Sequence, residues 1–506
     1  MTATRRRRPA RKPRATGVLS QPAWKKLRYR HAPFELLSSD AIESIHQSAQ
    51  EILRESGMLV LSADARRRFA EAGCAVDDES QLVRFDSAML DELLASAPSS
   101  FGLRARNPEK NLTIGDGHAV FTSVGGPAYV MDMDQGRRTG SYREMCDFIR
   151  LVQSLDILHQ EGGGGFEAMD LPAPSRHLDL FYAECTLLDK NWIPWTMGRE
   201  QTLDAIEMAT ISLGSSREEL VAEPALCGII NTNTPLQLDI PMAEGLIAMA
   251  EHGQAVAVTP FTLSGAMAPV TLAGALALQH AEAMAGIALT QIVRPGAPVL
   301  YGGFTSNVDM KTGSPAFGTP EYLQAAQASG QLARRLGVPL RSSNVNAANC
   351  PDAQAAYESC LSIWGAISGQ ASMIKHAAGW LHGGLTASLE KLIIDAEVLQ
   401  MVAASLEPFE VNRDTLAMDA IREVGPGGHF FGSEHTMERY QTAFYAPLLS
   451  DWSNYETWLE AGSANTEQRA NRIWKQLLSE YQQPPVDPAV DDALKDYVAR
   501  RKREIG

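Results

Sequence analysis

Residues 319–344 read TPEYLQAAQASGQLARRLGVPLRSSN, a stretch in which a helix ends and a strand begins. Thr319, Pro320 and Glu321 supply a helix N-cap, a proline at the first helical position and an acid in the first turn. Gly337 and Pro339 then stop the helical pattern. The stretch therefore predicts a helix over 320–336 that feeds a buried strand over 338–344.

The same alternation of a short apolar run with a long helical pattern occurs eight times between about residue 119 and residue 407. We predict strands at Ala119–Val124, Ile157–Glu161, Trp192–Met197, Ala225–Asn231, Ala255–Phe261, Pro298–Phe304, Val338–Asn344 and Ser372–His376. Helical patterns follow them at Tyr142–Leu155, His177–Lys190, Glu200–Leu213, Ile240–Gly253, Pro269–Val293, Pro320–Leu336, Asp352–Gly369 and Leu385–Leu406. This order predicts an α/β fold, a closed (β/α)8 TIM barrel, with its chemistry on the loops that leave the C-terminal ends of the strands.

The flanking segments lack this alternation. We predict a barrel over 116–406, with mostly helical caps over 31–115 and 407–506 that pack on the barrel or on a second subunit. Residues 1–30 hold eleven Lys or Arg and no acid, which leaves 34 of the 45 basic residues against all 60 acidic residues in the remainder. We interpret this basic tail as a disordered, solvated terminus rather than as an arm that binds nucleic acid.

Composition and cysteine usage indicate the class of protein. Hydrophobic residues make up 45% and charged residues 21% of the chain, as in soluble globular proteins. The apolar stretch 269–293 contains Gln279, His280 and Glu282, which are costly in lipid. We therefore predict a buried barrel helix there and no membrane partner. The six cysteines form no CxxC pair, which predicts reduced thiols in a cytoplasmic protein.

The predicted barrel mouth carries aromatic, amide and hydroxyl side chains and few charges. It has no carboxylate pair of the glycosidase kind, and the sequence has no HxH or HExxH, so we predict no metal site. Gly162–Gly165 is interpreted as a flexible or tightly turned loop rather than a phosphate cradle. Such a mouth suits a quaternary ammonium, which ring faces bind by about 0.5–2 kcal/mol per contact. The same rings are equally well explained as core.

Several longer motifs resemble the trimethylamine methyltransferase family. They are Gly125-Gly126-Pro127 with Tyr129-Val130, residues 265–279 (GAMAPVTLAGALALQ), 291–303 (QIVRPGAPVLYGG), 309–313 (DMKTG), 351–354 (PDAQ), 378–381 (AGWL), 390–392 (EKL) and 425–436 (GPGGHFFGSEHT). The likeness spans roughly residues 31–475, and the motifs occur in the family's order.

The resemblance implies a methyltransferase (EC 2.1.1) that moves a methyl group from a methylated amine to the Co(I) corrinoid of a partner carrier protein. It implies no permanently bound cofactor, and homo-oligomers. Founding members contain pyrrolysine, which this chain lacks. Because a quaternary ammonium leaves as a neutral tertiary amine, it needs no such residue. We therefore expect glycine betaine or a related betaine as the donor. The alternatives are carnitine, proline betaine, choline, trimethylamine or a sulfonium as the donor, or a non-catalytic betaine-binding protein.

This hypothesis assigns positions rather than acid–base roles, because the site needs only to hold the substrate. We expect Glu161 to balance the ammonium, and His376, with Asn231 or Asn344, to hold the carboxylate. His429 and Phe431 lie on a glycine-bounded loop that would fold over the mouth. The expected substrate-binding residues are Tyr129, Glu161, Trp195, Asn231, Phe261, Phe304, Asn344, His376, His429 and Phe431.

Overall fold

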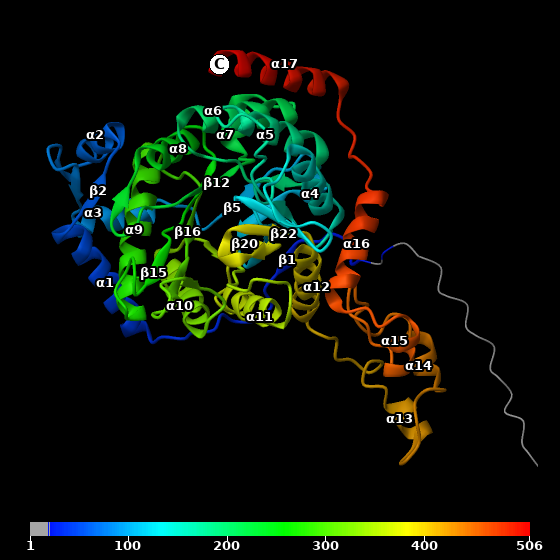
Figure 1. Ribbon diagram of the computed structural model, residues 1–506. Helices are drawn as coiled ribbons and strands as arrows, with labels where there is room; N and C mark the ends of the chain where they lie inside the picture. Colours follow the sequence, from blue (N-terminus) through cyan, green and yellow to red (C-terminus); the bar gives the residue numbers. More distant parts are fainter. Residues whose placement is uncertain (1–18, 20) are drawn as a thin grey trace, which may run out of the picture.

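A computed structural model describes residue 19 and residues 21–506, and in it eight parallel strands form a nearly closed barrel (Figure 1). The strands are β7 (His118–Ser123), β10 (Gln160–Glu161), β11 (Asn191–Trp192), β12 (Cys227–Ile230), β14 (Ala255–Val258), β16 (Val299–Gly302), β19 (Leu340–Ser343) and β20 (Met373–Ala378). Parallel pairing runs in the order β11-β10-β7-β20-β19-β16-β14-β12. The predicted barrel is thereby confirmed.

Side chains rather than backbone join the two end strands, β11 and β12. The Asn191 amide donates to the Ala225 carbonyl at 2.6 Å, and the Thr196 hydroxyl donates to the Ile229 carbonyl at 3.2 Å. Gly228 permits this approach, because a Cβ there would lie 2.6 Å from the Thr196 methyl group. Polar side chains therefore close the seam of the barrel.

The helices that alternate with the strands surround them as a ring (Figure 1). The helix of the quoted stretch begins where predicted, because the Thr319 side chain accepts the Tyr322 amide, and it ends at Gly337 with φ of 72°. The ring comprises α4 (Tyr142–Ser154), α5 (Arg176–Leu187), α6 (Arg199–Ser212), α8 (Ile240–Glu251), α9 (Leu272–Val293), α10 (Pro320–Leu336), α11 (Ala353–Ser368) and α12 (Leu389–Ser405); a short helix, α7 (Arg217–Ala222), follows α6.

Helix α9 is long and apolar enough to cross a membrane, yet 83% of that window is buried inside the protein. Its polar residues are paired: Gln279 bonds Tyr301 and Ser329, and Glu282 accepts bonds from Thr234 and the Leu236 amide. The helix packs against α8 and the N-terminal helices. The prediction of a buried barrel helix is confirmed.

The segment predicted as a mostly helical N-terminal cap contains helices α1 (Ser39–Glu55), α2 (Ala63–Glu71) and α3 (Ser87–Ala95), together with short strands. Strands β2 (Met58–Val60), β4 (Leu82–Arg84) and β3 (Ala75–Asp77) form a small sheet with β13 (Gln237–Leu238), and β5 (Ser100–Leu103) pairs with β6 (Leu112–Gly115). Leu103, Leu112 and Ile114 of this hairpin pack with barrel-interior residues such as Leu300. The hairpin therefore closes the barrel on the side away from the mouth.

The basic tail departs from the prediction where the structure describes it. Residues 1–18 and 20 lie outside the described residues. Strand β1 (Leu27–Arg28) pairs antiparallel with β7, and Leu27 and Tyr29 are buried. The Tyr29 hydroxyl donates to the Ala371 carbonyl at 2.8 Å. Residues 21–30 are therefore part of the fold, because alternating apolar side chains sit among the basic ones.

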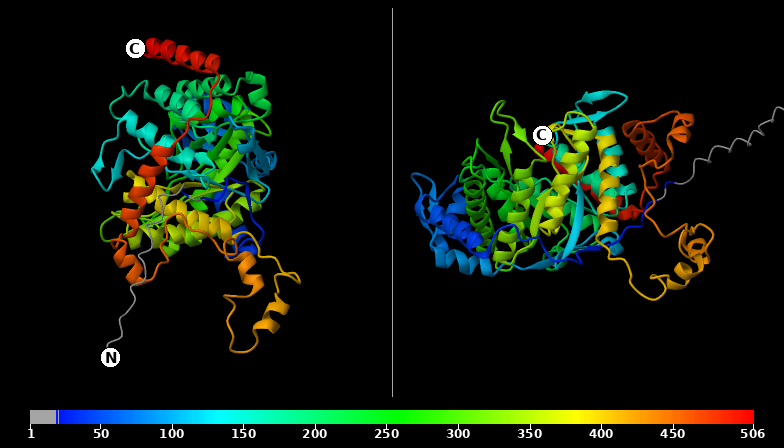
Figure 2. Two further views of the ribbon diagram at one scale, coloured as in Figure 1. Left: turned by 90° about the vertical axis from the view of Figure 1, so that its right-hand side faces the viewer. Right: turned by 90° about the horizontal axis from the view of Figure 1, so that it is seen from below.

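The C-terminal cap divides into helices on the barrel and a projecting lobe. Helix α16 (Thr466–Glu480) packs on α12, and α17 (Pro488–Ile505) packs on α5 and α6. Between α12 and α16 in the chain lie α13 (Met418–Val424), α14 (Glu434–Arg439) and α15 (Tyr455–Glu460). Both views of Figure 2 place α13 and α14 on the opposite side of the barrel from the hairpin β8 (Tyr129–Asp132)–β9 (Gly136–Arg138), which follows strand β7 at the mouth.

Candidate active site

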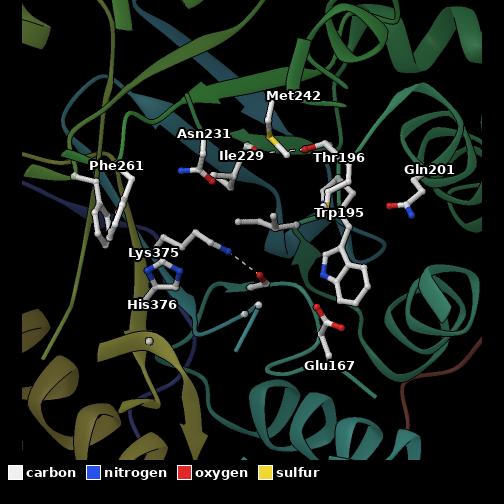
Figure 3. A pocket seen from close by; sticks show the side chains of 18 of the residues that line it. Glu167, Trp195, Thr196, Gln201, Ile229, Asn231, Met242, Phe261, Lys375 and His376 are labelled. Atoms are coloured by element: carbon white, nitrogen blue, oxygen red, sulfur yellow. Dashed lines mark hydrogen bonds between the residues drawn. The ribbon is translucent and has the colours of Figure 1, made fainter. Parts of the chain in front are cut away.

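A cavity of about 610 Å³ opens at the C-terminal ends of the barrel strands. Figure 3 shows side chains from several strand ends converging on it. Of the side chains predicted to bind substrate, the structure brings together Trp195, Asn231, Phe261, Phe304 and His376. Other lining residues include Gly125, Gly126, Gly162, Glu167, Arg176, Ile193, Thr196, Met197, Gln201, Ile229, Met242, Arg341, Lys375, Trp380 and Gly384.

Aromatic rings form one wall of the cavity. The Phe304 ring lies 5.1 Å from the Phe261 ring, 6.3 Å from the Trp380 ring and 6.0 Å from the Phe317 ring, centroid to centroid. Phe304 is nearly fully buried, whereas Phe261 is half-buried. Phe304 therefore belongs to the hydrophobic core and also lines the cavity. The Phe261 ring is the more accessible of the two to a ligand in the cavity.

Arg341 supplies a buried cation that the sequence analysis missed. It lies on β19 in register with Gly302, two residues before Phe304, and so one layer deeper in the barrel. The residue is only 2% exposed, and its Nε and Nη1 atoms have no hydrogen-bond partner. Burial lowers the pKa of the guanidinium to about 10, so it stays charged at neutral pH. A buried, under-bonded cation beside a cavity is costly unless an anion joins it.

Lys375 is a second basic group in the cavity wall, and its Nζ donates to the Gly162 carbonyl at 2.7 Å (Figure 3). Burial, and then the charge of Arg341, lower its pKa to about 7. Lys375 and His376 are consecutive yet both line the cavity, although side chains along a strand alternate. A register shift in β20 and a φ of 56° at His376 permit this.

His376 is neutral in this setting. Burial holds its pKa well below the usual range, and the nearby charges of Lys375 and Arg341 lower it further. The Nδ1 atom lies 3.3 Å from the Ser343 hydroxyl, and the ring lies 4.4 Å from the Trp380 ring. A neutral imidazole can accept or donate one hydrogen bond but cannot act as the counter-ion of a carboxylate.

Glu161 does not face the cavity, contrary to its predicted role. Its carboxylate accepts the Gly163 amide at 2.6 Å and the Gly164 amide at 3.0 Å, and it is fully buried. Behind it lies Glu184, whose pKa is raised well above the usual range by burial and by the charge of Glu161. Glu161 therefore holds the glycine loop, whose Gly163, Gly164 and Gly165 all take positive φ, as a tight turn requires.

The other predicted side chains also lie outside the cavity. The Arg137 guanidinium lies 3.9 Å from the centre of the Tyr129 ring and occupies its face. Asn344 is buried and donates its amide to the Ala377 carbonyl at 2.9 Å. His429 and Phe431 lie on the lobe between α13 and α14, which projects away from the mouth (Figure 2). A residue at the C-terminal end of a barrel strand lies near the mouth, but its place in the sequence does not show which way its side chain points.

Comparison with known proteins decides the family. The family model described as "Trimethylamine methyltransferase (MTTB)" matches residues 4–506. The chain belongs to this methyltransferase family. It is similar to a glycine betaine methyltransferase of Desulfitobacterium hafniense, with 36% identity over 94% of this chain and 98% of that protein. It is also similar to a trimethylamine methyltransferase of Methanosarcina thermophila, with 27% identity over 92% of this chain and 96% of the relative.

Among solved structures, the methyltransferase matches the monomethylamine methyltransferase (MtmB) of Methanosarcina barkeri with a TM-score of 0.48 and 10% sequence identity. The match covers 88% of this chain and 93% of that one. This likeness is weak, so the fold assignment rests on the strand pairing described above.

Among the described residues, one carboxylate lines the cavity of this methyltransferase, that of Glu167. This carboxylate pairs with Arg176 at 2.6 Å, and Figure 3 shows it across the cavity from Lys375 and His376. The cavity therefore combines basic side chains at its floor with an aromatic wall, and no free acid–base pair lines it in the part of the chain that the structure describes. Such an arrangement can bind and orient a zwitterion.

Proposed function

We propose that the chain transfers a methyl group from glycine betaine, or a related betaine, to the Co(I) corrinoid of a partner carrier protein. The observation that carries this proposal is the buried Arg341, whose under-bonded nitrogens lie below the aromatic wall of the cavity. An anion would satisfy these nitrogens, and a betaine has a carboxylate at the required end. The glycine betaine methyltransferase relative supports the same donor class.

The layering of the side chains favours one orientation of the donor. The carboxylate would lie against Arg341 and Lys375, in place of the predicted His376 with Asn231 or Asn344. Its trimethylammonium would then lie at the level of Phe261 and Trp195, where ring faces stabilise a cation. The Phe304 ring already has the Arg341 guanidinium 5.4 Å from its centre. This orientation turns an N-methyl group toward the mouth, where a partner has access.

Methyl transfer from a quaternary ammonium needs no acid or base from this chain. The C–N bond breaks with its electron pair on nitrogen, and the amine departs neutral. The corrinoid supplies the nucleophile that takes the methyl group. The chain's residues fix the donor in line with the mouth and exclude water around it, a form of positioning that lowers reaction barriers by several kcal/mol.

The rim of the mouth fits a corrinoid carried on another protein. Gly125, Gly126 and Gly384 leave the entrance free of bulky side chains, and Met197 and Leu385 there are exposed and apolar. A protein that docks over the mouth needs a footprint of about 800 Å² per partner. We therefore propose that this chain holds no corrinoid of its own and meets it on the carrier, in the cytoplasm.

The affinity for glycine betaine should fall as the pH rises through about 7. In the free chain Lys375 has a pKa of about 7, and a bound carboxylate favours its charged form and raises that pKa. Binding is thus tightest below pH 7 and weakens above it, while Arg341 stays charged and His376 neutral. Calorimetric titrations from pH 6 to 9 measure this slope. Lys375→Met should flatten it, and an equal slope in that variant would remove Lys375 from the site.

Replacing Phe261 by Leu should weaken binding of glycine betaine by about 0.5–2 kcal/mol, roughly 2- to 30-fold, if its ring contacts the ammonium. The matched ligand is 3,3-dimethylbutyrate, in which carbon replaces the ammonium nitrogen. Its affinity should be lower than that of betaine in the native chain and nearly unchanged by the substitution. Equal losses for both ligands would show that Phe261 contributes shape alone.

A larger carboxylated donor, such as carnitine or proline betaine, is the second candidate. The cavity of about 610 Å³ exceeds the volume of glycine betaine, so longer or cyclic betaines also fit. Both share the carboxylate that Arg341 requires. The distance from carboxylate to N-methyl differs among these donors, so their relative transfer rates identify the preferred one.

A further inference from the structure

Two buried carboxyl groups lie behind the donor cavity, those of Glu161 on β10 and Glu184 on α5. Glu161 accepts the Gly163 and Gly164 amides, as an ionised carboxylate does. Neither oxygen of Glu184 accepts a hydrogen bond from any residue that the structure describes. Burial, and then the charge of Glu161 and a hydrogen bond with it, raise the pKa of Glu184 well above the usual range. Carboxyl groups in such contact share one proton, and the hydrogen bonds place that proton on Glu184.

The pair does not touch the donor. Glu184 lines a separate small cavity of about 20 Å³, together with Arg106, Cys185 and Lys190. This volume is room for about one water molecule, so a betaine does not enter it. Glu161 faces the glycine loop, as described above. Any effect of the two carboxyl groups on the donor must therefore pass through another residue.

Lys375 links the pair to the donor cavity in two ways. Its Nζ donates to the Gly162 carbonyl at 2.7 Å, and Gly162 lies between Glu161 and the loop amides that this carboxylate accepts. Burial, and then the charge of Arg341, lower the pKa of Lys375 to about 7, and the charge of Glu161 opposes them. Both the place and the charge of Lys375 therefore depend on Glu161.

The charges around the site agree with a proton on Glu184. Arg341 is positive and Glu161 is negative. A protonated Lys375 and a donor carboxylate add one charge of each sign, so the occupied site is neutral overall. An ionised Glu184 would leave a net negative charge in the barrel and oppose the donor. Two further titratable groups near Lys375 are neutral, because burial raises the pKa of Cys227 to about 12 and lowers that of His376.

We propose that Glu161 is a positioning residue for Lys375, and that Glu184 holds the proton of the carboxyl pair. The Glu161 carboxylate supplies the buried negative charge that lets Lys375 become cationic when a donor carboxylate arrives. It also holds the loop that carries the Gly162 carbonyl. The proton that Lys375 gains comes from solvent, and Glu184 keeps its own. The inference rests on the proposed function in one respect, that the donor carboxylate meets Lys375.

Trace acetylation with acetic anhydride, followed by peptide mass spectrometry from pH 5 to 9, tests the inference without a donor. The reagent labels unprotonated amines, so labelling of Lys375 in the native chain should rise with a midpoint at about pH 7. Glu161→Gln keeps the size but removes the charge, and should lower this midpoint by about one pH unit or more. Glu184→Gln exchanges one neutral group for another and should leave it unchanged. The exposed Lys311 is the reference for reagent strength.

Equal midpoints in the native chain and Glu161→Gln would overturn the inference, and so would a Lys375 that stays unlabelled up to pH 9. A lower midpoint in Glu184→Gln would mean that Glu184 carries charge, which would overturn the assignment of the proton. That comparison needs only the native chain, so it decides the matter even if Glu161→Gln does not fold.

Calorimetric titration with glycine betaine separates this inference from the proposed function. The pH at which betaine affinity declines should be lower in Glu161→Gln than in the native chain. If Lys375 titrates as described and betaine does not bind, the proposed function alone fails. If betaine binds with the same pH dependence in both proteins, the inference alone fails.

Discussion

Replacing Arg341 by Met should raise the dissociation constant for glycine betaine about 30- to 1,000-fold. Removing one partner of a buried, hydrogen-bonded charge pair costs about 2–4 kcal/mol. Arg341 is in register with Met373, two residues before Lys375, and so lies deeper in the barrel than Lys375. Methionine fills similar space without charge. The free chain should not lose stability, because the guanidinium is buried with two nitrogens unbonded. Calorimetric titration and thermal unfolding of both proteins measure the two effects.

Arg341→Lys is the matched control for this substitution. It retains the charge but loses the forked geometry that binds a carboxylate through two hydrogen bonds. Its affinity should lie between those of the native chain and Arg341→Met. If Arg341→Met binds betaine as the native chain does, the carboxylate does not lie on β19 and the orientation proposed above is wrong.

Choline and trimethylamine should bind at least 1,000-fold more weakly than glycine betaine. Both present methylated nitrogen to the aromatic wall, but neither has a carboxylate for Arg341 and Lys375. A site built to pair with a polar group rejects analogues that lack it by about 10⁴-fold, because its own buried groups stay unpaired. Competition titrations against betaine measure the ratio.

The Arg341→Met variant is the control for this selectivity. Without the guanidinium, choline no longer leaves a buried charge unpaired, so the ratio of the affinities for betaine and choline should shrink toward one. A native chain that binds choline as tightly as betaine would show that the rings alone determine the donor.

The barrel could be predicted because its signals are local. Helix caps such as Thr319 and stops such as Gly337 mark element ends without reference to the rest of the chain. Local signals do not define the strand ends. The apolar pattern predicts one strand over Trp192–Met197, but β11 ends at Trp192 because the residues after it turn outward and line the mouth. The short strands of the N-terminal cap carry too few residues to show alternation.

The site was harder to predict because direction depends on contacts between distant segments. Glu161 lies at the end of a strand, where functional residues of a barrel are expected. The backbone amides of Gly163 and Gly164 in the following loop nevertheless donate to its carboxylate. The β20 irregularity brings Lys375 and His376 to one cavity, which no period-two pattern predicts. Arg341 could have been recognised from the sequence, because a charged residue inside a buried barrel strand is unusual. In the structure this residue lies at the floor of the cavity.

The most direct test of the proposed activity is the absorbance of Co(I) cobalamin mixed with the native chain and one donor at a time. Methylcobalamin should form from glycine betaine or another carboxylated quaternary amine. Little should form from choline or trimethylamine, and much less from betaine with Arg341→Met. Methyl transfer from trimethylamine at a rate equal to that from betaine, unchanged in Arg341→Met, would show that the carboxylate does not determine the donor.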